Sequence, residues 1–353
     1  MPETAEAVTA TAADLVGRHF RVRDHYDVGR EKIREFARAV RNDHPAHHRE
    51  DDAVKLGYAS LLASPTFASV IGAATTRSLI GTVLTEYDVA QTLHIDQTFE
   101  YHRPILAGDK LTVDVVVDSI RQRRGQEFGD NDFITVKVTL IDAQSLPVLV
   151  SITTIVARLG TELDPAAVAT MGGVVMHGHV EDPDSEFVNP AGLILLAPEE
   201  VAELADPAPA RPVYTVPADT LAAGTQLPAG KVHVTRGDLV NYAGVSGDPN
   251  PIHFSDTAAQ LAGLPTVVAH GMLTMGLTAD YLVSWLGDPA ALTKFSVRFA
   301  GYVPVEPTAP TPIEFTGKVK SVDAENGTAS LILGATSEGK KLFGRAVAEV
   351  RLS

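Results

Sequence analysis

The chain has 353 residues, 45% hydrophobic and 21% charged, a composition typical of a globular protein with room for two domains. Its net charge of −15 argues against non-specific binding to nucleic acid or to anionic membrane surfaces. Cysteine is absent, which excludes disulfides, thiolate catalysis and cysteine-ligated zinc. The first residues are acidic and no apolar run could span a bilayer, so we expect a cytoplasmic protein without membrane insertion.

The first 160 residues predict a helix followed by strands. Apolar spacing over residues 30–40 is typical of a helix that buries one face. Alternation of apolar and polar residues predicts strands near 91–103, 110–120, 132–142 and 147–159. A helix packed on an antiparallel sheet indicates an α+β unit, which we assign to residues 1–160.

Residues 161–225 predict a connector between two units. Proline, glycine, alanine and acidic residues concentrate there, and strong periodicity mostly disappears. We expect short local structure around 173–177 and 193–196.

The remaining residues, 226–353, repeat the order of the first unit. Thr235 and Asp238 have the spacing of a capping box at a helix start, and an apolar run over 271–286 predicts a longer helix. Strands are predicted over 294–299, 312–322, 329–335 and 342–352.

The two units match in detail, which indicates a duplication. Residues 36–47 align with 242–253, and 56–66 with 261–271, at offsets of 206 and 205. An alignment on proline pairs Asn42 with Asp248 and His47 with His253, and it places Thr66 opposite Gly271. An alternative alignment on the carboxylate pairs Asp43 and His48 with the same two residues. We prefer the proline alignment because it keeps the surrounding residues in step.

In the preferred alignment the first unit has lost its carboxylate. We therefore expect it to be non-catalytic, with the histidines of its turn (His44, His47 and His48) as solvated loop residues. A second active site and a histidine metal site are the alternatives. The metal site is disfavoured because no acidic or fourth ligand stands at metal spacing.

Residues 242–253, Tyr-Ala-Gly-Val-Ser-Gly-Asp-Pro-Asn-Pro-Ile-His, carry the strongest chemical signal in the chain. Asp248 and His253 lie five residues apart across a turn stiffened by two prolines. A carboxylate and an imidazole held in this way suit paired general acid–base catalysis. An Asp-Pro-x-x-x-His stretch on its own more often marks a surface turn.

Together with Ala269-His-Gly-Met, this stretch resembles the MaoC-type hydratase/dehydratase family of hotdog folds, whose signature runs from an aromatic residue to Gly-Asp-x-Asn-Pro-hydrophobic-His. The first unit is similar to the non-catalytic subunit of actinobacterial (3R)-hydroxyacyl-ACP dehydratase over residues 29–36, 56–58, 65–67 and 102–110. The resemblance implies a fusion of HadA-like and HadB-like subunits. The expected fold is an α+β double hotdog, in which two helices are each wrapped by an antiparallel sheet and packed as a pseudo-dimer.

The resemblance also implies an activity, the reversible dehydration of (3R)-3-hydroxyacyl thioesters. His253 would take the C2 proton, Asp248 would act with it on the water, and Asn250 would orient the turn or the water. The backbone N–H of Gly271, at a helix start, would stabilise the oxyanion. Substrate contacts are expected from His270, Tyr242, Pro65, Thr66 and Arg298, and neither a cofactor nor a metal is expected.

Several questions stay open at this point. The carrier is an acyl carrier protein (ACP) or coenzyme A (CoA), and the setting is fatty-acid elongation, including mycolic-type lipids, with elongation enzymes as partners. The alternatives are a CoA-directed (R)-specific enoyl hydratase, a hotdog thioesterase and a non-enzymatic acyl-binding protein. A monomeric pseudo-dimer and a homodimer both fit. The basic cluster over 121–124 suits either an acidic carrier or CoA phosphate, or a solvated loop.

Overall fold

The computed structural model describes residues 12–87, 92–124, 130–159, 166, 170, 174, 192–204 and 216–353. The expected local structure around 173–177 falls outside these residues except at position 174. No helix among the described residues is long and apolar enough to cross a membrane.

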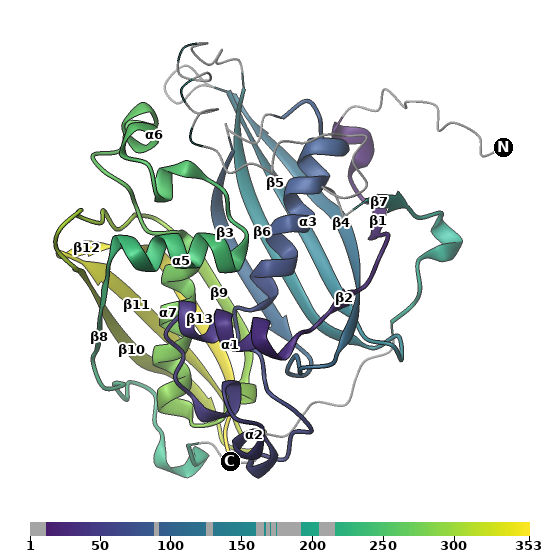
Figure 1. Cartoon of the computed structure of the whole chain (residues 1–353). Helices are drawn as coiled ribbons and strands as arrows, with labels where there is room; N and C mark the ends of the chain where they lie inside the picture. Colours follow the sequence, from purple (N-terminus) through teal and green to yellow (C-terminus); the bar gives the residue numbers. More distant parts are fainter. Residues whose placement is uncertain are drawn as a thin grey trace.

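The first unit contains a helix laid across a strongly twisted sheet (Figure 1). The predicted helix over 30–40 and the four predicted strands are confirmed. On β4, Val113, Val115 and Val117 are buried while their neighbours are not, the two-residue period of a half-buried strand. The elements are β1 (His19–Val22), β2 (Tyr26–Asp27), α1 (Arg30–Ala39), α2 (Glu50–Lys55), α3 (Ala68–Thr82), β3 (Thr92–Tyr101), β4 (Lys110–Arg123), β5 (Asp130–Ile141) and β6 (Pro147–Leu159).

The second unit repeats this order. The predicted capping box is confirmed, because the Thr235 N–H donates to Asp238 Oδ2 at 2.7 Å and the Asp238 N–H donates to Thr235 Oγ1 at 3.3 Å. The long helix has the predicted bounds. The elements are β8 (Gly230–Val234), α5 (Arg236–Ser246), α6 (Asp256–Leu261), α7 (Gly271–Leu286), β9 (Leu292–Phe299), β10 (Thr311–Asp323), β11 (Thr328–Ser337), β12 (Lys340–Lys341) and β13 (Phe343–Arg351).

One continuous sheet joins the two units. Its main strand order is β7-β1-β4-β5-β6-β3-β9-β13-β11-β10-β8, where β7 is Leu193–Leu195. Strands β3 and β9 pair antiparallel at the junction, and Thr98 and Ser296 share a hydroxyl hydrogen bond of 2.7 Å there. Because the duplicated strands β3 and β9 meet antiparallel, the units are related by a pseudo-two-fold axis near this pair.

The connector touches both units. Strand β7, within the expected local structure at 193–196, pairs with β1 of the first unit. Farther along, the Ala218 N–H donates to the Ser353 carbonyl and the Gly224 N–H to the Val319 carbonyl, both in the second unit. The boundaries proposed at 160/161 and 225/226 stay a prediction. The α+β arrangement of two helices, α3 and α7, each lying on its own half of the sheet, agrees with the sequence (Figure 1).

Candidate active site

A short, internally bonded turn follows helix α5. The helix ends at Gly247, whose φ of +71° lies in the left-handed region that favours glycine. Asp248 Oδ1 then accepts the Asn250 N–H at 3.1 Å. The Asn250 side chain in turn accepts the Ile252 N–H at 3.2 Å and caps the 3-10 turn Pro251–His253. These bonds hold the turn that presents the Asp248 and His253 side chains.

The His253 ring is held as a neutral base. Its side chain is nearly buried, with 8% of the residue exposed, and Nδ1–H donates to the Val268 carbonyl at 2.7 Å. That bond fixes the tautomer and leaves the Nε2 lone pair free. Burial lowers the pKa of His253, and the Asp248 charge and the Val268 carbonyl oppose this effect. The ring is therefore ready to accept a proton at neutral pH.

Asp248, His253 and His270 lie close together. One carboxylate oxygen and one nitrogen from each ring all lie within 4.8 Å of one another. The two imidazole rings stack at a centroid distance of 3.7 Å, and the Tyr242 ring lies 4.9 Å from His270. Burial above all, and His253 after it, hold the pKa of His270 well below its ordinary value. His270 is thus a neutral ring stacked on that of His253.

One carboxylate and two imidazoles are ligand types that zinc accepts. Here the histidine rings are stacked within 26° of parallel, so their nitrogen lone pairs lie in nearly parallel planes rather than converging on one ion. His253 Nδ1 is also committed to a backbone carbonyl. The expectation that the chain carries neither metal nor cofactor stays a prediction.

Helix α7 begins at Gly271, directly after His270. The N–H groups of the first turn have no acceptor within their own helix, and the helix dipole makes this end partly positive. A Cβ at position 271 would lie 3.2 Å from the Phe299 ring, so glycine permits this close approach of backbone and ring. The dyad and a free helix N-terminus are adjacent.

Two residues of the first unit reach this site, and the sequence did not identify them. Arg77, on α3, donates from Nη2 to the Gly247 carbonyl at 2.7 Å. His94, on β3, packs edge-on against Phe299 at 5.2 Å between ring centroids. Burial lowers the pKa of both residues, and the negative charge of Asp248 opposes that effect. No local motif marks either position, because their partners lie about 150 residues or more away in the chain.

The other sequence-predicted residues lie in different surroundings. Tyr242 is buried beside His270, and burial raises the pKa of its hydroxyl. Arg298 bonds Asp96 at 3.1 Å on the exposed side of the β3–β9 junction. Pro65 and Thr66 belong to the first unit's copy of the site, where Thr66 packs near Gly276 of α7. The structure therefore groups Tyr242 with His270 and the dyad, whereas the contacts just described for Arg298 and Thr66 are with other residues. Their substrate contacts stay predictions.

The first unit keeps a degenerate copy of the turn. His47 Nδ1–H donates to the Leu62 carbonyl at 2.7 Å, the same bond that His253 makes to Val268. Both pairs are related by 206 residues (253 − 47 and 268 − 62), which confirms the proline alignment. Asn42, 1% exposed, occupies the position of Asp248.

The prediction that the histidines of this copy are solvated was wrong. His47 is completely buried, and burial lowers its pKa to about 3. His44 Nε2 lies 2.6 Å from the Gly287 carbonyl, and His48 Nε2 lies 2.8 Å from the Asn42 carbonyl. The duplicated turn folds as its counterpart does and packs against the second unit, so these rings are structural.

The correspondence of Thr66 with Gly271 also needs correction, by one residue. The Ala63 N–H donates to the Ile105 carbonyl as the Ala269 N–H does to Val303, so the offset of 206 persists. Pro65 therefore occupies the position of Gly271. Proline has no N–H, so the first copy lacks a backbone donor at this position.

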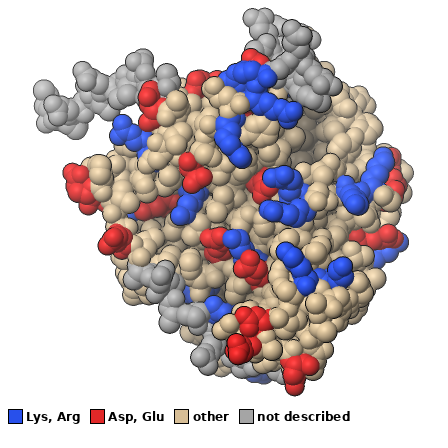
Figure 2. All heavy atoms as spheres, turned by 180° about the vertical axis from the view of Figure 1, so that it is seen from behind, with Lys and Arg blue, Asp and Glu red and all other residues tan. Residues whose placement is uncertain are grey.

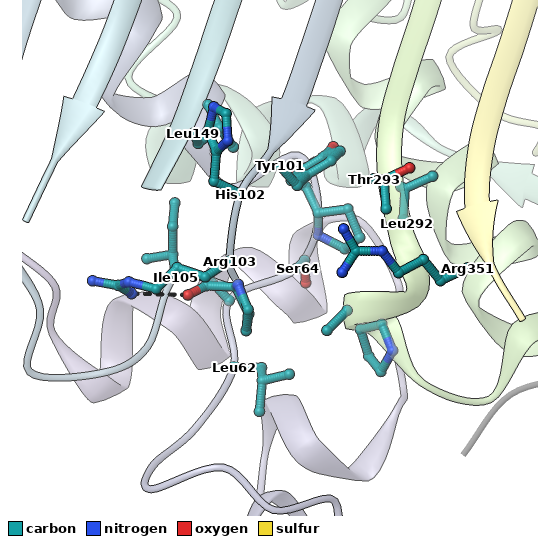
Figure 3. A pocket seen from close by; sticks show the side chains of 15 residues that line it. Leu62, Ser64, Tyr101, His102, Arg103, Ile105, Leu149, Leu292, Thr293 and Arg351 are labelled. Carbon is teal, nitrogen blue, oxygen red and sulfur yellow. Dashed lines mark hydrogen bonds between the residues drawn. The ribbon is translucent and has the colours of Figure 1, made fainter. Parts of the chain in front are cut away.

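A pocket lies beside this degenerate copy, between the units (Figure 3). The Tyr101 hydroxyl donates to the Pro65 carbonyl at 3.0 Å, and Arg103 at the rim is paired with Asp109 at 2.7 Å. Its lining comes from 62–65, 101–105 and Leu149 of the first unit and from Pro289, Ala290, Leu292, Thr293 and Arg351 of the second. This pocket contains no carboxylate–imidazole pair.

The basic cluster over 121–124 is exposed at the end of β4. Arg124 pairs with Asp132 at 2.5 Å and lies 3.8 Å from Asp130, so part of the cluster's charge is balanced. On the face seen in Figure 2, basic and acidic side chains are interspersed. A contact between this cluster and an acidic carrier stays a prediction.

Comparison with known proteins matches both units. The model of the FAS1-like dehydratase domain region covers residues 14–150, and that of the MaoC-like domain covers 219–335. A UPF0336 protein of Mycobacterium tuberculosis is 39% identical over 151 residues, 43% of this chain and 88% of that protein. One from Saccharopolyspora erythraea is 38% identical over 43% of this chain and 93% of that protein.

Solved structures match over nearly the whole chain. A MaoC-like dehydratase is 38% identical with a TM-score of 0.84, covering 96% of this chain and 99% of that one. A Mycobacterium tuberculosis protein described as a double hotdog has a TM-score of 0.62 and 15% identity, covering 96% of each chain, and supports the fold alone. The expected double hotdog is thus confirmed, and the chain belongs to the MaoC-like dehydratases.

Proposed function

We propose that the chain catalyses the reversible dehydration of (3R)-3-hydroxyacyl thioesters to trans-2-enoyl thioesters, at one site per chain. The observation that carries the proposal is the free Nε2 of His253 beside the Asp248 carboxylate. The N-terminus of α7 at Gly271 lies next to this pair.

In the dehydration direction, His253 Nε2 accepts the C2 proton of the substrate. The electrons of the C2–H bond form the double bond, the C3–O bond breaks, and the leaving hydroxyl takes a proton from the dyad and departs as water. Asp248 holds that water and stabilises the transient imidazolium. Hydration is the reverse, with water losing its proton to the dyad and adding to C3.

The surroundings of the dyad favour this chemistry. Burial keeps His253 neutral, so the base form is available at neutral pH. Loss of the C2 proton moves negative charge onto the thioester oxygen. The Gly271 N–H would donate to that oxygen, a contribution typically worth about 10²- to 10³-fold in rate. The degenerate copy has neither the carboxylate nor this N–H, which supports a single site per chain.

The thioester carrier is ACP or CoA, and the setting is fatty-acid elongation in the cytoplasm, extending to mycolic-type lipids. Relatives from mycobacteria and Saccharopolyspora support an actinobacterial lipid setting. Elongation enzymes would be the partners. One chain holds both hotdog units, so a monomeric pseudo-dimer suffices, and a homodimer of such chains is the alternative. A CoA-directed (R)-specific enoyl hydratase would use the same residues in the hydration direction.

The test follows the absorbance of the conjugated enoyl thioester with crotonyl-CoA, then with long-chain CoA and ACP substrates. Wild type should lose this absorbance without releasing thiol. Asp248→Asn and His253→Ala should each lower kcat by about 10²- to 10⁴-fold. His47→Asn in the degenerate copy is the matched control. Its kcat per folded molecule should equal that of wild type.

Other outcomes distinguish the alternatives. Release of free thiol would indicate a thioesterase. No change with any CoA or ACP substrate would indicate an acyl-binding protein. Full activity in both dyad variants would show that the mechanism is wrong.

A further inference from the structure

We propose that Arg77 of the non-catalytic unit is a positioning residue for the catalytic turn, through which the first unit controls the second unit's site. This inference rests on the proposed function. It assigns to the degenerate unit a part in catalysis beyond covering the sheet of its partner.

The contact is made at the residue just before the catalytic carboxylate. Arg77 Nη2 donates to the Gly247 carbonyl at 2.7 Å, and Asp248 is the next residue. Gly247 is the C-cap of α5, where unpaired carbonyls and the negative end of the helix dipole favour a cation. Arg77 is partly buried, so its bond to Gly247 is shielded from solvent.

Two other cations of the first unit bind the same helix. Lys32 Nζ donates to the Val245 carbonyl at 2.6 Å, near the C-terminus of α5. At the N-terminus, Arg41 pairs with Asp238 of the capping box at 2.7 Å. Helix α5 is therefore held at both ends by the non-catalytic unit. Of these three cations, Arg77 bonds the residue directly before Asp248, and the Asp248 charge opposes the lowering of the Arg77 pKa by burial.

The duplication provides an internal comparison for Arg77. The residue 206 positions later is Val283, on α7 and completely buried. The turn that corresponds to Gly247 and Asp248 is Arg41 and Asn42, and Arg41 keeps the left-handed φ, at +54°. The cation is thus absent opposite the copy that lost its carboxylate. The cation and the carboxylate are therefore present together in one copy and absent together in the other. A residue that only held the two units together would not need to be paired with the carboxylate.

Arg77 would act by orienting the Gly247 peptide and by placing positive charge beside the dyad. The titratable groups that surround the dyad are His94 from β3, His270 at the start of α7, and Tyr242 from α5. Removing a positive charge from this group favours protonation of the site, so its loss should shift the titration to higher pH.

The experiment compares Arg77→Gln, Arg77→Lys and the matched control Lys32→Gln, which removes the neighbouring cation on α5. Arg77→Gln should lower kcat by about 10- to 100-fold, the effect of a small misplacement of a catalytic group, with a smaller change in KM. The acidic limb of its kcat/KM profile should move to higher pH. Arg77→Lys should keep the wild-type limb while recovering only part of kcat, and Lys32→Gln should leave the limb in place.

An NMR titration of His253 tests the same point without turnover. The pKa of His253 should be higher in Arg77→Gln than in wild type and unchanged in Lys32→Gln. The inference would be overturned if Arg77→Gln kept the wild-type kcat and the wild-type acidic limb of kcat/KM. It would also be overturned if the His253 pKa shifted equally in Arg77→Gln and Lys32→Gln. In both cases the proposed function would stand. If wild type turns over no enoyl thioester, the proposed function fails and the titration alone decides the role of Arg77.

Discussion

A single residue, at position 271, distinguishes the two copies of the site by the presence or absence of a backbone N–H. The first unit has Pro65 there, in the turn before α3. Position 271 is the first residue of α7, and proline suits the first position of a helix because its missing N–H has no partner in the helix. His270 already has the extended conformation that precedes proline, with φ −57° and ψ 136°. Gly271→Pro should therefore fold while losing the oxyanion donor.

Gly271→Ala is the control for this substitution, because alanine adds a Cβ toward Phe299 as proline does but keeps the N–H. We expect kcat of Gly271→Pro to fall about 10²- to 10³-fold below that of Gly271→Ala. The two rates are compared on the same enoyl thioester. Equal rates would remove the Gly271 N–H from the mechanism.

The sequence was sufficient to predict that Asp248 and His253 lie together, because they are only five residues apart across one turn. It was insufficient for His47. The pattern around that histidine resembles a solvated loop, whereas the folded turn buries the ring completely and bonds it to the Leu62 carbonyl. Arg77 is a further case, since its partner Gly247 is 170 residues away and no periodicity connects them.

At the scale of elements, helix α7 approaches the first unit closely at Gly276. A Cβ there would lie 2.6 Å from Val40 Cγ1 and 3.2 Å from Thr66 Oγ1. Gly276→Ala should therefore destabilise the protein by about 1–3 kcal/mol through overpacking, measured by urea unfolding. Val40→Ala combined with Gly276→Ala should recover part of this loss.

Gly244→Ala on α5 is the matched helical glycine, because its added Cβ would meet nothing within 4 Å. That variant should be stabilised by about 0.5–1 kcal/mol, the usual gain for glycine to alanine in a helix. If Gly276→Ala were as stable as Gly244→Ala, the close packing between the units at α7 would be wrong.

At the scale of the whole molecule, buried neutral histidines make folding sensitive to acid. Burial lowers the pKa of His47, His253 and His270, so between their folded values and about 6.5 the unfolded chain binds more protons. Stability should be complete above pH 6.5 and fall as the pH drops below it. Each such histidine contributes up to about 1.4 kcal/mol per pH unit.

His47→Asn should reduce this loss, because asparagine cannot titrate and its amide offers an N–H in place of Nδ1–H. Urea midpoints measured from pH 7.5 to 4.5 should fall less steeply in the variant than in wild type. A constant difference between the two proteins across that range would contradict a buried, neutral His47.

The sequence by itself predicted helices α1, α5 and α7, most strands, the duplication and the turn that pairs Asp248 with His253, because periodicity, capping and proline turns act over a few residues. It did not predict helix α3. Short strands such as β1 and β8 escaped it, since they owe their conformation to pairing with β4 and β10. Only the tertiary structure decided that His47 is buried, that Pro65 replaces Gly271, and that Arg77 reaches the turn before Asp248. Those facts depend on contacts between two units whose paired residues are far apart in the chain.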